Sequence, residues 1–171
     1  GNPPALSHGY KDKPYHPLWR MDIHYLHRPE DFVWIEGAKQ AVKYVNDKGY
    51  LAILVTNQSG VARGYYPAED VKKVYDWMNE ELKKQDAHLD ALYYCPHHEN
   101  GTVAGYSFAC DCRKPSPKMV NLACERFDID KERSFFVGDT ESDMRCAENA
   151  GVKGIRYEGG SLLETLRRML K

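Results

Sequence analysis

Two short pairs of potential metal ligands stand close together in the middle of the chain. The first pair is Cys95 and His97, and the second is Cys110 and Cys112. Zinc in structural sites takes four nitrogen and sulfur ligands in a tetrahedron, and these pairs supply three thiolates and one imidazole. The alternative is a set of reduced cysteines beside an unrelated histidine. Because cysteines this tightly clustered usually bind a metal or form disulfides, the spacing predicts a zinc site.

A pair of cations follows the second ligand pair directly. Arg113 carries a forked guanidinium and Lys114 a compact ammonium, and both groups suit the oxygens of a phosphoryl group. Taken alone, such a pair is more often a solvated surface feature. Its position beside a predicted metal ligand favours a phosphoryl-binding role, because a metal loop would fix the direction of both side chains.

A polar loop follows a predicted buried strand in the first half of the chain. It begins Thr56-Asn57-Gln58-Ser59-Gly60 and offers hydroxyl, amide and backbone N–H groups to phosphate oxygens. In an open parallel sheet, ligands bind beyond the carboxyl ends of the strands, which is where this loop is expected. An ordinary polar loop that caps the next helix is the alternative interpretation.

Two acidic residues follow a later predicted strand that ends in Gly138. Asp139 comes directly after that glycine, and Asp143 lies one turn into the next helix. Magnesium prefers oxygen ligands, so two carboxylates at this place suit it. The alternative is that the acids only cap the amino end of the helix. The order strand, glycine, aspartate favours a magnesium site.

Apolar strands alternate with amphipathic helices from about residue 32 onward. Helices are predicted at 37–48, 67–82, 116–127, 141–150 and from 161, and strands at 50–55, 89–94, 134–137 and within 152–157. Gly49 and Gly151 are predicted helix stops, Ser116 a helix N-cap, and Ser161 the start of a capping box. The alternation predicts an α/β fold, in which a parallel sheet carries helices on both faces.

Composition limits the class of protein. The 171 residues suit a single domain. Basic and acidic residues number 24 and 25, so no overall field would attract nucleic acid or an anionic membrane. Five cysteines without a disulfide framework favour a reducing compartment, and no apolar run has the length of a membrane span. A cytoplasmic monomer without nucleic-acid or membrane partners is expected.

Taken together, the motifs resemble those of the haloacid-dehalogenase (HAD) superfamily of phosphatases. The resemblance covers roughly residues 22 to 157 and rests on HRPEDF at 27–32, EG at 36–37, VTNQSGVARG at 55–64, YYCPHH at 93–98, CDCRKP at 110–115 and VGD at 137–139. Within the superfamily, the chain is most similar to the branch of heptose-bisphosphate phosphatases and histidinol-phosphatases.

This resemblance implies a Rossmann-like HAD fold, a zinc-binding loop in place of a cap domain, and hydrolysis of a phosphorylated sugar through an aspartyl-phosphate. The implied catalytic residues are Thr56 and Lys114. Substrate contacts are implied for Asp22, Tyr25, Asn57, Gln58, Ser59 and Arg113. The implied cofactors are Zn²⁺, bound by Cys95, His97, Cys110 and Cys112, and Mg²⁺, bound by Asp139 with support from Asp143.

One motif of the superfamily is missing. Its members begin with an apolar strand that ends in Asp-x-Asp, and the first of these aspartates is the nucleophile. At the corresponding distance before Thr56 this chain has Pro14 and His16, in a stretch that four prolines interrupt. We therefore expect an irregular or altered segment at 1–21 and a HAD-like phosphatase domain at 22–171.

Several functions remain open on this basis. The first is a magnesium-dependent phosphatase that acts on a phosphorylated sugar, with histidinol phosphate as an alternative substrate. The second is a catalytically inactive module that still binds phosphate, because covalent catalysis needs an activated nucleophile in line with phosphorus. A zinc-stabilised structural domain is a third. Whether the chain is an enzyme therefore depends on the missing aspartates.

Overall fold

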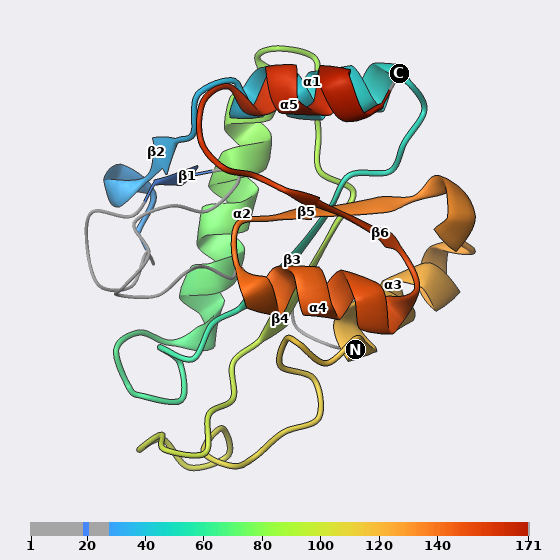
Figure 1. The fold of residues 1–171 in the computed structure, drawn as a ribbon. Coiled ribbons are helices and arrows are strands. Elements are labelled where there is room, and N and C mark those ends of the chain that lie inside the picture. Colours follow the sequence, from blue (N-terminus) through green and yellow to red (C-terminus); the bar gives the residue numbers. More distant parts are fainter. Residues whose placement is uncertain (1–18, 21–27, 171) are drawn as a thin grey trace.

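The structure is a computed structural model that describes residues 19–20 and 28–170. Helices and strands alternate along most of its length (Figure 1). In chain order the elements are β1 (Trp19–Arg20), the 3-10 helix η2 (Pro29–Asp31), β2 (Val33–Trp34), α1 (Ala38–Asp47), β3 (Ile53–Asn57), α2 (Ala68–Lys83), β4 (Ala91–Cys95), α3 (Lys118–Phe127), the 3-10 helix η3 (Lys131–Arg133), β5 (Phe135–Gly138), α4 (Glu141–Ala150), β6 (Lys153–Arg156) and α5 (Leu162–Met169).

Local signals explain where several helices begin and end. At the start of α4, Thr140 and Asp143 form a capping box, and the helix stops at Gly151, whose φ of 78° favours glycine. At the start of α5, the Ser161 hydroxyl accepts a hydrogen bond from the N–H of Glu164, which is the serine half of the predicted capping box. No helix in the described part of the chain is long and apolar enough to cross a membrane.

The predicted N-cap of α3 is one residue off. Pro117 occupies the capping position, and its side chain makes no capping hydrogen bond. The Ser116 hydroxyl still accepts a hydrogen bond of 3.2 Å from the N–H of Lys118. The serine therefore satisfies a helix N–H group from a position just outside the cap.

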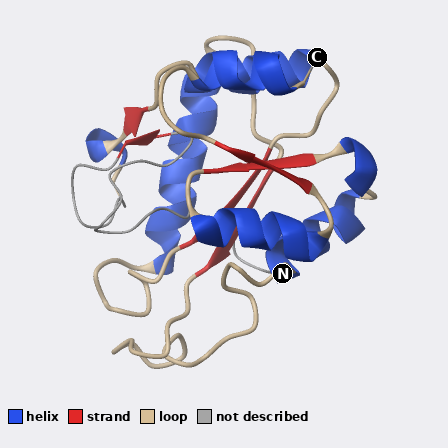
Figure 2. Cartoon of the chain, in the orientation of Figure 1, coloured by secondary structure: helices blue, strands red, loops and turns tan. Residues whose placement is uncertain are grey.

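The parallel strands form two separate pairs in the part of the chain that the structure describes. β3 pairs with β4 from Ile53 opposite Ala91 onward, and β5 pairs with β6 from Phe135 opposite Lys153 onward. A third pair, β1 with β2, is antiparallel. The predicted α/β class with parallel strands is confirmed, but no described strand joins β3 to β5 (Figure 2).

Helices cover both faces of β4. Because alternate side chains of a strand face opposite sides, Leu92 and Tyr94 enter a core with α1, α2 and α5, whereas Ala91, Tyr93 and Cys95 pack against α3. In Figure 1, α1 and α5 lie together on one side of the strands, and α3 and α4 lie on the other. This two-sided cover explains why every residue of β4 is buried.

Candidate functional site

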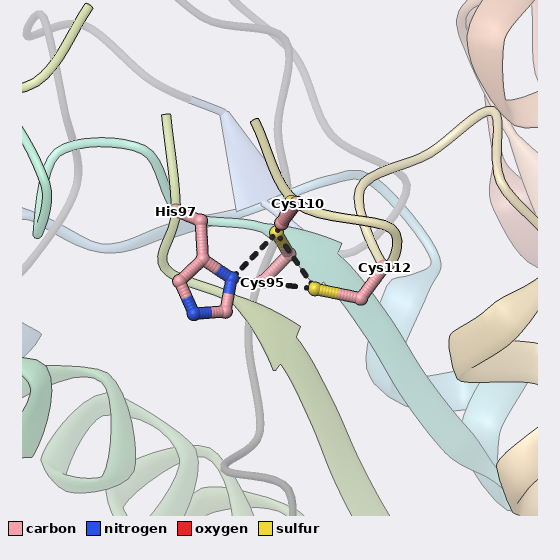
Figure 3. Close-up of side chains that lie close together, drawn as sticks. All are labelled: Cys95, His97, Cys110 and Cys112. Carbon is pink, nitrogen blue, oxygen red and sulfur yellow. Dashed lines mark hydrogen bonds between the residues drawn. The ribbon is translucent and has the colours of Figure 1, made fainter. Parts of the chain in front are cut away.

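The end of β4 and the loop that precedes α3 bring the four predicted zinc ligands together (Figure 3). The Sγ atom of Cys95 lies 3.4 Å from Sγ of Cys110 and 3.2 Å from Sγ of Cys112. Nδ1 of His97 lies 3.6 Å and 3.3 Å from the sulfurs of Cys95 and Cys112. Around a tetrahedral zinc ion with Zn–S of about 2.3 Å, two sulfurs stand about 3.8 Å apart. The donor set therefore fits zinc, and zinc binding itself stays a prediction.

Hydrogen bonding inside this cluster makes one thiol acidic. The hydrogen bond with Cys95 lowers the pKa of Cys112 to about 5, and hydrogen bonds with His97 and Cys110 act in the same direction. The same bond to Cys112, together with burial, raises the pKa of Cys95. Since the thiolate is the form that binds metal, Cys112 is already prepared as a ligand, whereas Cys95 would have to release its proton on zinc binding.

The side chain of Asn57 clamps the backbone of Lys114. The Lys114 N–H donates to Oδ1 of Asn57 at 3.0 Å, and Nδ2 of Asn57 donates to the Lys114 carbonyl at 3.4 Å. Asn57 is the last residue of β3, so the loop after the cysteines is tied to the carboxyl end of that strand. Both polar atoms of the Asn57 amide are used in this clamp. The predicted direct contact between Asn57 and a substrate stays a prediction.

The ammonium of Lys114 is held in a buried ion pair. Nζ lies 2.6 Å from Oδ1 of Asp143, and the two side chains are only 3% and 5% exposed. The other oxygen of Asp143 accepts hydrogen bonds from the N–H groups of Asp139 and Thr140, at 3.2 Å and 3.3 Å. Gly138 makes room for this arrangement, since a Cβ at that position would overlap with the Asp143 side chain.

The predicted magnesium ligands lie beside this ion pair. Asp139 directly follows β5, and its Oδ1 atom is buried. A carboxylate oxygen in such a place is the kind of ligand that magnesium takes. Both oxygens of Asp143 are already engaged, so Asp139 fits as the ligand and Asp143 as its support. Magnesium binding by these residues stays a prediction.

Two buried hydroxyl groups lie at the end of β3. The side chains of Thr56 and Ser59 are 0% and 2% exposed, and their oxygens have no hydrogen-bond partner among the residues described. An unsatisfied buried polar group costs about 1–3 kcal/mol, so such a pair suggests a bound ligand. Gln58 is different, because its side chain accepts a hydrogen bond of 3.0 Å from the Tyr66 hydroxyl.

Two further basic side chains, Arg63 and His98, contact each other close to the Cys/His cluster. Burial, together with the charges of Arg113 and Arg63, lowers the pKa of His98. The Arg63 guanidinium lies 3.1 Å from Nε2 of His98. Arg63 was not among the predicted site residues, although it lies in the polar stretch that begins at Thr56. The predicted contacts of Asp22 and Tyr25 lie outside the described residues.

Comparison of the sequence with known proteins shows to which family this chain belongs. A family model described as HAD-hydrolase-like matches residues 111–168. The D-glycero-beta-D-manno-heptose-1,7-bisphosphate 7-phosphatase of Rhodopseudomonas palustris is 39% identical over 147 residues, which are 86% of this chain and 82% of the relative. Its counterpart in Haemophilus ducreyi is 44% identical over 134 residues, 78% of this chain and 73% of the relative. This chain belongs to the heptose-1,7-bisphosphate 7-phosphatase family of HAD hydrolases.

Solved structures agree with the family assignment. The D,D-heptose 1,7-bisphosphate phosphatase from B. bronchiseptica, complexed with magnesium and phosphate, superposes with a TM-score of 0.73 at 28% identity and covers 88% of this chain and 80% of that one. A putative HAD-like phosphatase from Mesorhizobium loti gives a TM-score of 0.75 at 30% identity, with 93% and 76% covered. The HAD fold and the resemblance inferred from the motifs are both confirmed.

Proposed function

We propose that this member of the heptose-bisphosphate phosphatase family is a magnesium-dependent phosphatase that acts on a phosphorylated sugar. The proposal rests on the observation that buried hydroxyl groups and a buried ammonium group lie together at the carboxyl ends of β3 and β5. The buried hydroxyls of Thr56 and Ser59 lie there beside Asn57, which clamps the loop of Lys114. Hydroxyl donors and a buried ammonium together suit a phosphoryl group.

The residues have separate tasks in this proposal. Thr56 and Ser59 would donate hydrogen bonds to phosphoryl oxygens, while the Lys114 ammonium stabilises the charge that develops during transfer. Asn57 and Asp143 would hold the backbone and the ammonium of Lys114 in place. Positioning and charge stabilisation dominate phosphoryl transfer, so fixed donors matter more than mobile ones. Magnesium, when bound at Asp139, would supply further neutralisation of phosphate charge.

The relatives support the choice of substrate and metal. Both proteins compared above by sequence are named heptose-1,7-bisphosphate 7-phosphatases. The B. bronchiseptica protein was crystallised with magnesium and phosphate. A phosphorylated heptose is therefore the first substrate to try, and magnesium the first metal.

Binding without turnover is the second candidate function. No Asp-x-Asp stands before Thr56, and both oxygens of Asp143 are occupied at the site. Covalent catalysis needs an attacking group aligned with phosphorus, and the described site offers no second aspartate beyond Asp139 for that task. On this reading residues 1–171 would hold a phosphate ester and leave it intact.

One pair of measurements separates the two candidates. Phosphate release from D-glycero-D-manno-heptose 1,7-bisphosphate is followed with and without Mg²⁺, and calorimetry records binding of orthovanadate to the zinc-loaded protein. Release that needs Mg²⁺ supports the phosphatase. Vanadate binding without release supports the binding module, and the absence of both would contradict each of them.

A further inference from the structure

A buried tyrosine closes the polar loop that follows β3. Tyr66 is the last loop residue before Pro67, the N-cap of α2, and it is 5% exposed. It belongs to the apolar core to which α1, α2 and α5 contribute. Its hydroxyl donates a hydrogen bond of 3.0 Å to Oε1 of Gln58, near the beginning of the same loop. Tyr66 therefore joins the end of the loop to its start.

The ring of Tyr66 lies directly against the backbone of Gly60. A Cβ atom at Gly60 would overlap with Cε1 of the ring and would stand 2.7 Å from the hydroxyl oxygen. The ring thus fills the space that any side chain at this position would need. The φ angle of Gly60 lies outside the left-handed region. It is therefore the contact with Tyr66, and not the backbone conformation, that requires glycine here.

Ser59 stands between the two residues that Tyr66 contacts. Its carbonyl accepts a hydrogen bond of 3.0 Å from the N–H of Arg63, and the N–H of Gln58 donates to the Cys95 carbonyl at 2.7 Å. The backbone of this turn is therefore tied to the end of β4. The Ser59 hydroxyl, in contrast, is buried without a hydrogen-bond partner among the residues described. One donor of the turn thus remains available to a ligand.

The hydrogen bond between Tyr66 and Gln58 is buried at both ends. The two residues are 5% and 4% exposed. A hydrogen bond is stronger inside a protein than in water, and a buried polar group without a partner is costly. A glutamine side chain has three torsions, so its carboxamide could take several orientations beside Ser59 if this bond were absent. The tyrosine hydroxyl selects one of them.

We propose that Tyr66 is a positioning residue of the candidate phosphate site, which holds the Gln58-Ser59-Gly60 turn so that the Ser59 hydroxyl points at the bound anion. This inference rests on the proposed function, because the anion is the phosphoryl group of the substrate. Donors that are fixed before the ligand arrives stabilise its charge better than donors that must first rearrange. A role in core packing alone would need the ring of Tyr66 and not its hydroxyl.

Tyr66→Phe separates the two roles, because it keeps the ring on Gly60 and removes the hydrogen bond to Gln58. Calorimetry measures orthovanadate binding to the zinc-loaded protein with Mg²⁺ present. The expected loss of affinity is about threefold to tenfold, as for the removal of one hydrogen bond. Unchanged affinity of this variant would overturn the proposal.

Tyr75→Phe is the matched control variant. The Tyr75 hydroxyl donates a hydrogen bond of 3.3 Å to the carbonyl of Leu89, which precedes the amino end of β4. This change also removes one tyrosine hydroxyl, but at the opposite end of the strand from the candidate site. Unchanged vanadate affinity is expected. An equal loss in both tyrosine variants would show that the effect is not specific to Tyr66.

Double-mutant cycles test the path from Tyr66 to the anion. Gln58→Met removes the acceptor with little change in size, and Ser59→Ala removes the hydroxyl proposed to meet the anion. If Tyr66 acts through these residues, the addition of Tyr66→Phe to either variant costs less than about twofold in affinity. The full threefold to tenfold loss in either background would overturn the proposal, since Tyr66 would then act by another route.

Gly60→Ala tests the ring contact from the other side. The added Cβ overlaps with the ring, so Tyr66 must move, and vanadate affinity is expected to fall by about tenfold or more. In Gly60→Ala/Tyr66→Ala the space is restored, and the combined loss should be smaller than the product of the two single losses. Losses that multiply would contradict the contact. If Gly60→Ala does not fold, Tyr66→Phe and its cycles still decide.

A measurement without ligand distinguishes a failure of this inference from a failure of the proposed function. Nitrogen-15 relaxation reports the order of the Gln58 side-chain NH₂ group on the fast timescale. We expect this group to be as ordered as the backbone of β3, and to lose order in Tyr66→Phe. Unchanged order would overturn the positioning role. If the unmodified protein binds no vanadate while the order falls as expected, the phosphate site is contradicted, and Tyr66 still holds the turn.

Discussion

Lys114 is the residue on which the candidate site depends. Asn57 fixes the backbone of Lys114, and Asp143 fixes its ammonium. The ring centre of Phe136 lies 5.8 Å from the Lys114 Nζ atom. These three partners come from β3, α4 and β5, so one side chain joins three elements. A buried ion pair of this kind is costly to break, because removal of one partner leaves the other charge buried without compensation.

Asp143→Asn is predicted to destabilise the fold by about 3–5 kcal/mol, because the Lys114 ammonium stays buried without its counter-ion. The matched control is Asp111→Asn, which breaks the exposed pair between Asp111 and Lys118. That change is expected to have little effect, since solvent screens the exposed pair. Urea denaturation of both variants measures the difference. Similar losses in the two would show that Lys114 is not energetically dependent on Asp143.

Gly138→Ala tests the space that Asp143 occupies. A Cβ at Gly138 overlaps with the Asp143 side chain, so we expect a loss of about 1–3 kcal/mol and weaker vanadate binding. Gly154→Ala is the control, because its nearest neighbour would be the flexible end of Met144 at 3.0 Å. Urea denaturation and calorimetry compare the two. A Gly138→Ala protein with normal stability and vanadate affinity would mean that Asp143 can move without consequence.

At the scale of elements, the cluster of Cys95, His97, Cys110 and Cys112 joins the end of β4 to a long segment without secondary structure. Residues 96–117 contain no helix or strand in the structure. Loops of this length without structure of their own are uncommon in compact domains and usually serve a function. Cys95 at the end of β4, together with His97, anchors one end of the loop, and Cys110 and Cys112 anchor the other. The metal would therefore set the path by which Lys114 reaches β3.

Cys110→Ser or Cys112→Ser is predicted to remove zinc and to lower stability by about 3 kcal/mol or more, since metal binding and folding are coupled. Vanadate affinity should fall as well, because the loop of Lys114 loses its anchor. Elemental analysis and thermal unfolding measure both effects. Cys124→Ser is the control, as that thiol lies in α3 outside the cluster. Full zinc content in either cluster variant would remove that cysteine from the ligand set.

At the scale of the whole molecule, the sequence predicts those features that depend on residues close together along the chain, such as helix bounds and metal-ligand spacing. The periodicity predicted α4 with its observed bounds, and the spacing of cysteines and histidine predicted which four side chains assemble. The clamp between Asn57 and Lys114 was not predictable, because their separation along the chain says nothing of which polar groups meet. The pairing of the described strands, β3 with β4 and β5 with β6, was not predictable for a similar reason, since alternation indicates parallel strands but not their order.

The global stability is predicted to depend on alkaline pH through Cys146. This thiol is fully buried between α3 and α4, beside Val120 and Ala150, and burial raises its pKa to about 11 from an ordinary value of 9.0. Above pH 9 the unfolded chain loses this proton, whereas the folded chain keeps it up to about pH 11. The stabilisation is therefore complete below pH 9 and is lost as the pH rises to 11.

The free energy of unfolding should fall more steeply in this window for the unmodified chain than for Cys146→Ala. The expected difference in slope is up to about 1.4 kcal/mol per pH unit. Slopes are compared rather than absolute stabilities, because the alanine also leaves a small cavity that costs the same at every pH. Urea titrations at intervals from pH 8 to 11, with zinc and a reductant present, give both curves. Parallel curves would mean that the Cys146 thiol ionises as readily in the folded chain as in the unfolded one.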